Sequence, residues 1–163
     1  MILKRKVITL GYQTGIHKKG DFSLSDLIKN TIKNKDYFKA GAIAQFIGVV
    51  RGATIEGEKV KKLEIEAYEK KANEVLNDIC KELSKKNGIV NVQIHHLIGE
   101  FNVGDVLVYV SVAGSHRTDV FPVLNEAVER YKREVPIFKK EFIKNLNGRQ
   151  IEYWVSEKDN VKK

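Results

Sequence analysis

Cysteine and proline are scarce in this 163-residue chain, which contains one cysteine, Cys80, and two prolines. A single thiol excludes an internal disulfide and a cysteine-rich metal site. No proline-rich linker, low-complexity segment or internal repeat is present. Cys80 falls on the apolar face of a predicted helix, so we interpret it as a core residue rather than a reactive thiol.

Long hydrophobic runs are absent as well. No apolar run approaches the roughly 18–20 residues that a membrane-spanning helix needs. Residues 1–6 lack the apolar core of a signal peptide. The sequence therefore predicts a soluble, reduced, cytoplasmic protein without a membrane partner. Its length predicts a single domain over 1–157, followed by a polar tail over 158–163.

Basic residues exceed acidic ones, with 29 Lys and Arg against 21 Asp and Glu, for a net charge of +8. Residues 1–39 contain nine basic and three acidic residues, or +6, while 40–163 contain 20 and 18, or +2. Such an excess suits a nucleic-acid binder, a pocket for a small anion, or a solvated basic surface with no specific partner. The charge alone leaves these alternatives open.

Hydrophobic periodicity predicts alternating strands and helices. The expected strands cover 6–10, 42–50, 60–68, 89–97, 106–113, 142–146 and 149–155. The expected helices run from 23 or 25 to 36, from 70 to 86, and from 118 or 119 to 135. This order predicts an α+β fold, in which helices pack on a mixed, mainly antiparallel sheet and the chain ends in a β-hairpin at Asn147-Gly148.

Several local expectations accompany this assignment. Residues 11–20 are expected to form a loop, and 98–105 contains two turn signals. The strand over 42–50 is nearly all apolar, which predicts burial on both faces. Pro122 is expected in the first turn of its helix, where a missing N–H does little harm. The first helix is expected to pack through four apolar side chains, namely Leu24, Leu27, Ile28 and Ile32.

Three basic clusters are candidates for anion binding. His116 and Arg117 follow a buried strand and precede a helix, whose free N–H groups favour an anion. Arg51 ends another buried strand. Lys132 lies near the end of the last helix, and Pro136 turns the chain so that Lys139 can return toward it. A neighbouring cation lowers the pKa of a lysine, which is one route to a general base or nucleophile. Solvated surface charges remain the alternative for each cluster.

Other motifs do not support a site. Residues 15–20 have the glycine spacing of a phosphate-binding loop, but Asp21 stands where its lysine is required. His95 and His96 are adjacent on a predicted strand, so their rings face opposite sides and cannot chelate one metal. No serine- or cysteine-hydrolase constellation is present.

Six segments in one order together resemble a known family, the large, catalytic subunit of molybdopterin synthase. The segments are 41–52 (GAIAQFIGVVRG), 63–69 (LEIEAYE), 98–105 (IGEFNVGD), 115–117 (SHR), 135–141 (VPIFKKE) and 153–155 (YWV). They cover about residues 40–157. The chain departs from the family pattern at Leu97, where an Arg is usual, and at Phe138, where a Trp is commoner. Lys158 is the nearest cation to a position after Trp154 where the family often has an Arg.

The resemblance implies a hammerhead-like α/β fold and a specific reaction. The family transfers sulfur from the C-terminal Gly-Gly thiocarboxylate of a small ubiquitin-like partner to cyclic pyranopterin monophosphate, which forms the dithiolene of molybdopterin. It implies a homodimer within a heterotetramer, with pockets built from both copies. It implies neither cofactor nor metal, and no nucleic-acid partner.

The resemblance also assigns residues. Lys132 and Lys139 match the two functional lysines, with Lys139 expected at the reacting carbon of the tail and Lys132 in proton transfer. The substrate-binding residues are expected to be Arg51, His116, Arg117, Lys140 and, near the tail channel, Phe46. Two alternatives stay open: an inactive scaffold for a ubiquitin-like protein, and an RNA-binding module. The latter would use Lys4, Arg5, Lys6, Lys18 and Lys19.

Overall fold

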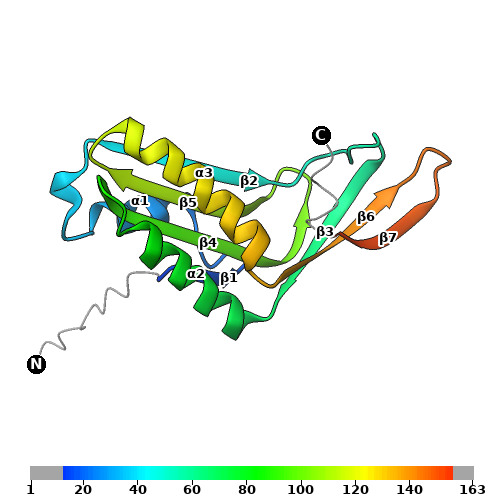
Figure 1. Ribbon diagram of the computed structural model, residues 1–163. Coiled ribbons are helices and arrows are strands. Elements are labelled where there is room, and N and C mark those ends of the chain that lie inside the picture. Colours follow the sequence, from blue (N-terminus) through cyan, green and yellow to red (C-terminus); the bar gives the residue numbers. More distant parts are fainter. Residues whose placement is uncertain (1–12, 156–163) are drawn as a thin grey trace, which may run out of the picture.

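Within residues 13–155, seven strands form one sheet in the order β2-β5-β4-β3-β6-β7, with β1 beside β4 (Figure 1). The computed structural model describes residues 13–155, so the strand expected over 6–10 and the tail over 158–163 lie outside the described residues. The strands are β1 (Gly15–Lys18), β2 (Ala42–Val49), β3 (Lys59–Ala67), β4 (Ile89–Asn102), β5 (Val106–Gly114), β6 (Ile137–Lys144) and β7 (Gln150–Val155). The helices are α1 (Leu24–Ile32), α2 (Glu69–Leu83), α3 (Arg117–Glu134) and the short 3-10 helix η1 (Tyr37–Lys39).

The predicted α+β class is confirmed. Adjacent strands pair antiparallel except β1, which runs parallel to β4. The C-terminal hairpin of β6 and β7 turns at Asn147-Gly148 as predicted, and Gly148 has a φ of 79°. Figure 1 shows this hairpin extending away from the helices. Among residues 13–155, no helix is both long and apolar enough to span a bilayer.

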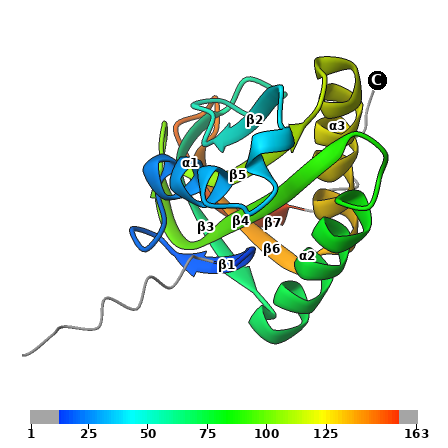
Figure 2. The same cartoon turned by 90° about the vertical axis from the view of Figure 1, so that its left-hand side faces the viewer.

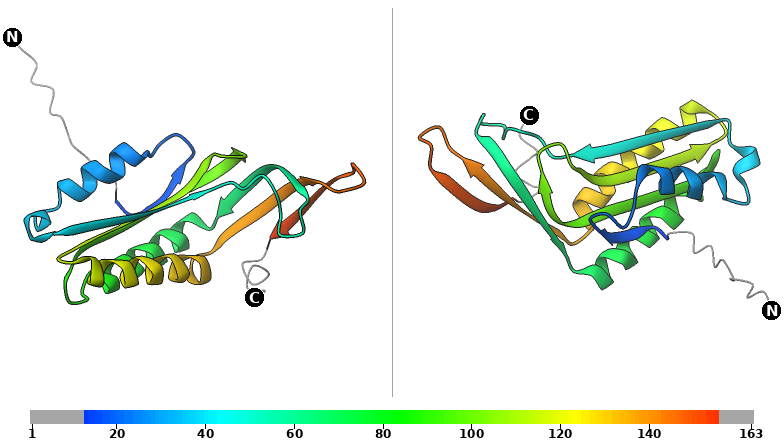
Figure 3. Two further views of the ribbon diagram at one scale, coloured as in Figure 1. Left: turned by 90° about the horizontal axis from the view of Figure 1, so that it is seen from above. Right: turned by 180° about the vertical axis from the view of Figure 1, so that it is seen from behind.

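Helices α2 and α3 lie on one face of the sheet and α1 lies on the other (Figures 2 and 3). The larger apolar core fills the space between α2, α3 and the central strands β4 and β5. Leu76, Ile94, Val110 and Val120 are fully buried there. Cys80 is buried in the same core, and burial raises the pKa of its thiol to about 12. Its predicted role in packing is therefore confirmed.

Strand β4 is longer than predicted and connects the two halves of the sheet. Its first part, through His96, pairs with β5, and its second part, from Gly99, pairs with β3. The turn expected at Ile98-Gly99 is absent because Gly99, at a φ of 123°, bends the strand without ending it. The reversal occurs later, where Gly104 has a φ of 90° and the Asp105 carboxylate accepts a hydrogen bond from the N–H of Asn102.

Two predictions near the N-terminal end of the described chain were wrong. Residues 15–18 form β1 rather than a loop, because their backbone pairs with β4, from which they are far apart in sequence. Helix α1 begins at the capping box of Ser23 and Asp26, as the Ser23 alternative predicted, but it ends at Ile32. Of its four apolar side chains, Leu27 is fully buried while Leu24, Ile28 and Ile32 are exposed.

Two further predictions, on the burial of β2 and on the position of Pro122, also need correction. Strand β2 pairs only with β5 and is an edge strand, and only one of its faces packs on the core, through Ala42, Ala44 and Phe46. Ile43, Ile47 and Val49 are exposed rather than buried. Helix α3 begins at Arg117, which makes Pro122 its sixth residue, beyond the first turn.

Candidate active site

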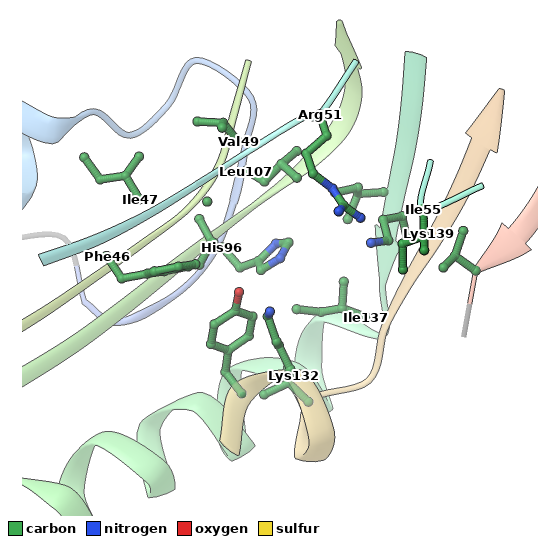
Figure 4. A pocket seen from close by; sticks show the side chains of 16 residues that line it. Phe46, Ile47, Val49, Arg51, Ile55, His96, Leu107, Lys132, Ile137 and Lys139 are labelled. Atoms are coloured by element: carbon green, nitrogen blue, oxygen red, sulfur yellow. The ribbon is translucent and has the colours of Figure 1, made fainter. Parts of the chain in front are cut away.

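A cavity of about 500 Å³ lies between β2, the end of α3 and the start of β6 (Figure 4). Four residues predicted from the sequence line it: Phe46 from β2, Arg51 just after β2, Lys132 from α3 and Lys139 from β6. Most of the remaining lining is aliphatic, and it includes Ile47, Val49, Ile55, Leu107 and Ile137. The cavity lining within residues 13–155 contains three cations and no carboxylate, so it favours an anionic ligand.

The two lysines meet because the chain reverses at Pro136. Helix α3 ends at Glu134 and the backbone of Val135 is extended, with a φ of −86° and a ψ of 129°. Strand β6 starts immediately afterwards, and Lys139 pairs with Ile65 of β3. Lys132, in the last turn of α3, therefore borders the same cavity as Lys139. This convergence agrees with the sequence-based prediction.

Arg51 and Phe46 reach the cavity from the edge strand. The Val50 N–H donates to the carbonyl of Asp105, which holds the chain against the β4–β5 turn just before Arg51. Gly48 allows close strand packing, because a Cβ there would lie 2.6 Å from a methyl group of Val108. Figure 4 shows the Arg51 guanidinium and the Lys132 ammonium directed toward the centre of the cavity.

His116 and Arg117 do not line this cavity in one copy of the chain. His116 is the N-cap of α3 and Arg117 its first residue. Lys132 is 15 residues further along the helix, which corresponds to about 22 Å. The Nδ1 atom of His116 lies 3.5 Å from the carboxylate of Asp119. Within one copy of the chain, His116 and Arg117 therefore lie far from the anion-binding residues of the cavity.

Lys140 is also outside the cavity, because adjacent residues of a strand point to opposite faces. Its Nζ lies 2.9 Å from a carboxylate oxygen of Glu152. The same atom lies over the rings of Phe142 and Trp154, 5.2 and 5.9 Å from their centroids. The hydrogen bond to Glu152 raises the pKa of Lys140. These contacts belong to the outer face of the hairpin.

His96 lines the cavity, although the sequence analysis assigned it no role and rejected it, with His95, as a metal-chelating pair. It is 6% exposed, and its Nδ1 lies 3.0 Å from the carbonyl oxygen of Leu97. Its ring packs edge-on against Tyr131, with centroids 5.9 Å apart. Burial, with a smaller effect of the Lys139 charge, lowers the pKa of His96 to about 4. The alternation of β4 was the available signal, since it directs His96 toward α3.

His95 faces the opposite side of the sheet, as predicted. Its ring stacks on Phe22 at 3.9 Å, and its Nδ1 lies 3.0 Å from Nε2 of His17. Burial lowers the pKa of His95 to about 3. Within the described part of the chain, no group of three or more His, Cys, Asp or Glu side chains could hold a metal ion. Lys19, named in the RNA-binding alternative, forms a 2.5 Å ion pair with Asp105.

Comparison with known proteins connects this architecture to characterised relatives. The molybdopterin synthase catalytic subunit of Bacillus subtilis is 39% identical over 113 residues, which cover 69% of this chain and 71% of that protein. A probable molybdopterin synthase of Haloferax volcanii is 36% identical over 120 residues, or 73% of this chain. The match spans only 44% of that longer protein.

Solved structures share the fold. The crystal structure of molybdopterin synthase from Staphylococcus aureus matches with a TM-score of 0.75 and 30% identity, covering 88% of this chain and 97% of that one. A complex of subunits 1 and 2 of molybdopterin-converting factor from Helicobacter pylori contains a chain with a TM-score of 0.63 and 20% identity, with coverages of 84% and 87%. The model of the MoaE protein family matches residues 17–134. From this match and the relatives above, the chain belongs to the MoaE family.

Proposed function

We propose that this chain is the catalytic subunit of molybdopterin synthase. It transfers sulfur from the C-terminal thiocarboxylate of a small ubiquitin-like partner to cyclic pyranopterin monophosphate, and so forms the dithiolene of molybdopterin. The observation that carries the proposal is the convergence of Arg51, Lys132 and Lys139 on one largely apolar cavity. Membership of the MoaE family supports the same reaction. The cytoplasmic location expected from the sequence is part of this proposal.

The three cations suit the charges of this reaction. The pyranopterin carries a cyclic phosphate and the partner's tail ends in a thiocarboxylate, so two anions must approach each other. Cations in a largely apolar cavity offset that repulsion more strongly than they would in water. Arg51 provides a planar guanidinium that can hold phosphate oxygens through two N–H groups.

The lysines are assigned to the reacting atoms. Sulfur transfer requires a carbon–sulfur bond to form on the pterin and the acyl–sulfur bond of the tail to break. Water adds to the acyl carbon in the second step, so that the tail leaves as an ordinary carboxylate and the sulfur stays on the pterin. Negative charge develops at the acyl group during that break, and Lys139 stabilises it. Lys132 exchanges protons with the reacting groups. Phe46 forms part of the channel that admits the tail.

A second copy of the chain completes the pocket in this proposal. His116 and Arg117 bind the phosphate of the substrate held by the other copy, because about 22 Å of helix separates them from Lys132 in their own copy. The exposed apolar residues of edge strand β2, namely Ile43, Ile47 and Val49, support such a self-association. One small partner at each pocket then gives a heterotetramer.

The test is reconstitution from purified components. The chain is mixed with thiocarboxylated partner and cyclic pyranopterin monophosphate, and molybdopterin is measured after conversion to a fluorescent derivative. We expect product only when the partner carries the thiocarboxylate, and none with the partner's ordinary carboxylate. Absence of product with the thiocarboxylated partner, together with salt-sensitive RNA binding, would favour the RNA-binding alternative.

A further inference from the structure

His96 is a buried polar side chain that the proposed mechanism does not use. It is 6% exposed and lines the same cavity as Arg51, Lys132 and Lys139. Figure 4 shows its ring directed into the space between these cations, from the wall opposite Ile137. A ring nitrogen that the protein leaves unpaired in such a place can bind a ligand, because an unpaired polar group in an apolar setting costs free energy.

The hydrogen bond to Leu97 fixes the tautomer of this ring. A carbonyl oxygen only accepts hydrogen bonds, so Nδ1 of His96, at 3.0 Å, carries the proton. In the neutral ring, Nε2 then carries a lone pair. Among residues 13–155, no hydrogen-bond donor contacts Nε2. Every side-chain nitrogen or oxygen atom described there that solvent cannot reach has a hydrogen-bond partner. Nε2 is therefore open to the cavity as an acceptor.

Burial keeps the ring neutral, and the charge of Lys139 adds a smaller effect in the same direction. Lys139 of β6, Lys132 of α3 and Arg51 after β2 surround the cavity, and Tyr131 of α3 packs on the ring. A positive charge on His96 would lose its hydration and would also be repelled by these cations. The three cations bind anionic groups, whereas a neutral acceptor selects a group that donates a hydrogen bond.

We propose that Nε2 of His96 accepts a hydrogen bond from an N–H group of the pterin and so orients the heterocycle in the cavity. This inference rests on the proposed function and adds a substrate-recognition residue to it. A pterin offers N–H donors at the edge of a flat ring system. Phe46 and Tyr131 line the cavity beside His96 and offer aromatic surfaces of matching shape.

Binding of cyclic pyranopterin monophosphate under nitrogen, measured by calorimetry, tests this role. His96→Leu removes the acceptor, so the pterin N–H loses its partner, and we expect roughly tenfold weaker binding. His96→Gln retains an acceptor oxygen at similar reach, and we expect binding within about threefold of the wild type. His17→Leu is the matched control, because it removes a histidine outside the cavity, and its affinity should equal that of the wild type. Thermal unfolding of each variant checks that it is folded.

The pH dependence gives a second readout. Because His96 is neutral at pH 6 to 8, the ratio of wild-type to His96→Leu affinity should stay constant across that range. A ratio that rises toward pH 6 would mean that a protonated imidazole donates to the ligand, and would overturn the acceptor role. Equal affinities of wild type and His96→Leu would overturn the proposal, and so would equally weak binding by the Leu and Gln variants.

A further arm separates the pterin from the peptide tail, whose amide N–H groups are also donors. Affinity for the thiocarboxylated partner should be the same in wild type and His96→Leu. Loss of partner binding with intact pterin binding would overturn the assignment to the pterin. Failure of the wild-type chain to bind the pterin would contradict the proposed function itself, whereas wild-type binding with an unaffected His96→Leu would contradict only the role of His96.

Discussion

At the scale of single residues, burial determines the chemistry of two neighbouring histidines. His95 packs under α1 against Phe22, and His96 lines the cavity on the other face of β4. Burial holds the pKa of His95 at about 3 and that of His96 at about 4, both below the ordinary value of 6.5. The unfolded chain therefore binds protons at these residues at a pH where the folded chain does not.

This difference predicts that acid destabilises the protein. Because both folded pKa values lie below the unfolded value, the stabilisation is complete above pH 6.5 and is lost as the pH falls toward 4 and 3. Protonation of each histidine in the unfolded chain should lower the free energy of unfolding by about 2 kcal/mol between pH 7 and pH 5. In urea titrations, the free energy of unfolding at pH 7 minus that at pH 5 should be about 2 kcal/mol smaller for His96→Gln than for the wild type.

Phe121→Gln is the control for this measurement, since Phe121 is 60% exposed and neither side chain titrates. It should keep the wild-type dependence on pH. An unchanged dependence in His96→Gln would contradict the buried, neutral state of His96.

At the scale of elements, the bend of β4 positions the site. The strand places His96 opposite Val108 of β5 and then, past Gly99, continues beside β3. Strand β3 in turn pairs with β6, which carries Lys139. The bend at Gly99 thus sets how the half of the sheet with His96 meets the half with Lys139.

Gly99→Ala should destabilise the fold through the backbone alone. The φ of 123° is unfavourable for any residue with a Cβ, although the nearest atom to that Cβ would be 3.8 Å away. We expect a loss of roughly 1–3 kcal/mol of unfolding free energy in urea. Gly52→Ala, at a glycine without a positive φ and with its nearest neighbour 3.4 Å away, should change stability by less than about 0.5 kcal/mol. Equal effects of both substitutions would contradict the strain at Gly99.

Sequence patterns predicted the positions of helices, strands and turns better than they predicted which strands pair and which faces are buried. The amphipathic stripe of α2 and the Asn147-Gly148 turn depend on neighbours in sequence, and both were predicted correctly. Strand β1 was missed because its partner, β4, is about 80 residues away. The apolar composition of β2 suggested burial on both faces, but a pattern of residues does not reveal that a strand lies at the edge of a sheet.

The same distinction applies to the site. The turn at Pro136 made the approach of Lys132 and Lys139 predictable, and both line the cavity. The role of His96 depends on the carbonyl of Leu97 and on the packing of Tyr131, which no local pattern reports. The functional assignments of His116, Arg117 and Lys140 remain predictions, and so does the single domain over 1–157.

At the scale of the whole molecule, the net charge of +8 says little about the cavity. Six of these charges belong to residues 1–39, whereas the cavity residues Arg51, Lys132 and Lys139 lie in a region of net +2. The useful charge is local, because folding gathers cations from distant parts of the chain. The remainder of the proposed anion site, His116 and Arg117, would come from a second copy.

A pocket shared between copies predicts complementation. Arg117→Ala and Lys139→Ala should each be inactive as homodimers, because each removes one contribution to both pockets. In a mixed dimer, one pocket receives the intact residue from each copy and the other pocket lacks both. Random mixing should therefore restore about a quarter of wild-type turnover. Co-expression with two affinity tags isolates the mixed dimer, and no recovery in it would contradict the shared pocket.

The proposed function places sulfur transfer in the cavity of Arg51, Lys132 and Lys139. The most direct measurement is single-turnover formation of molybdopterin by Lys132→Ala and Lys139→Ala with saturating thiocarboxylated partner. Arg133→Ala is the control, because Arg133 is next to Lys132 but lies outside the cavity and pairs with Glu134. We predict a loss of at least about a hundredfold in rate for both lysine variants, with partner binding and the Arg133→Ala rate unchanged. Near-wild-type turnover in both lysine variants would contradict sulfur transfer in this cavity.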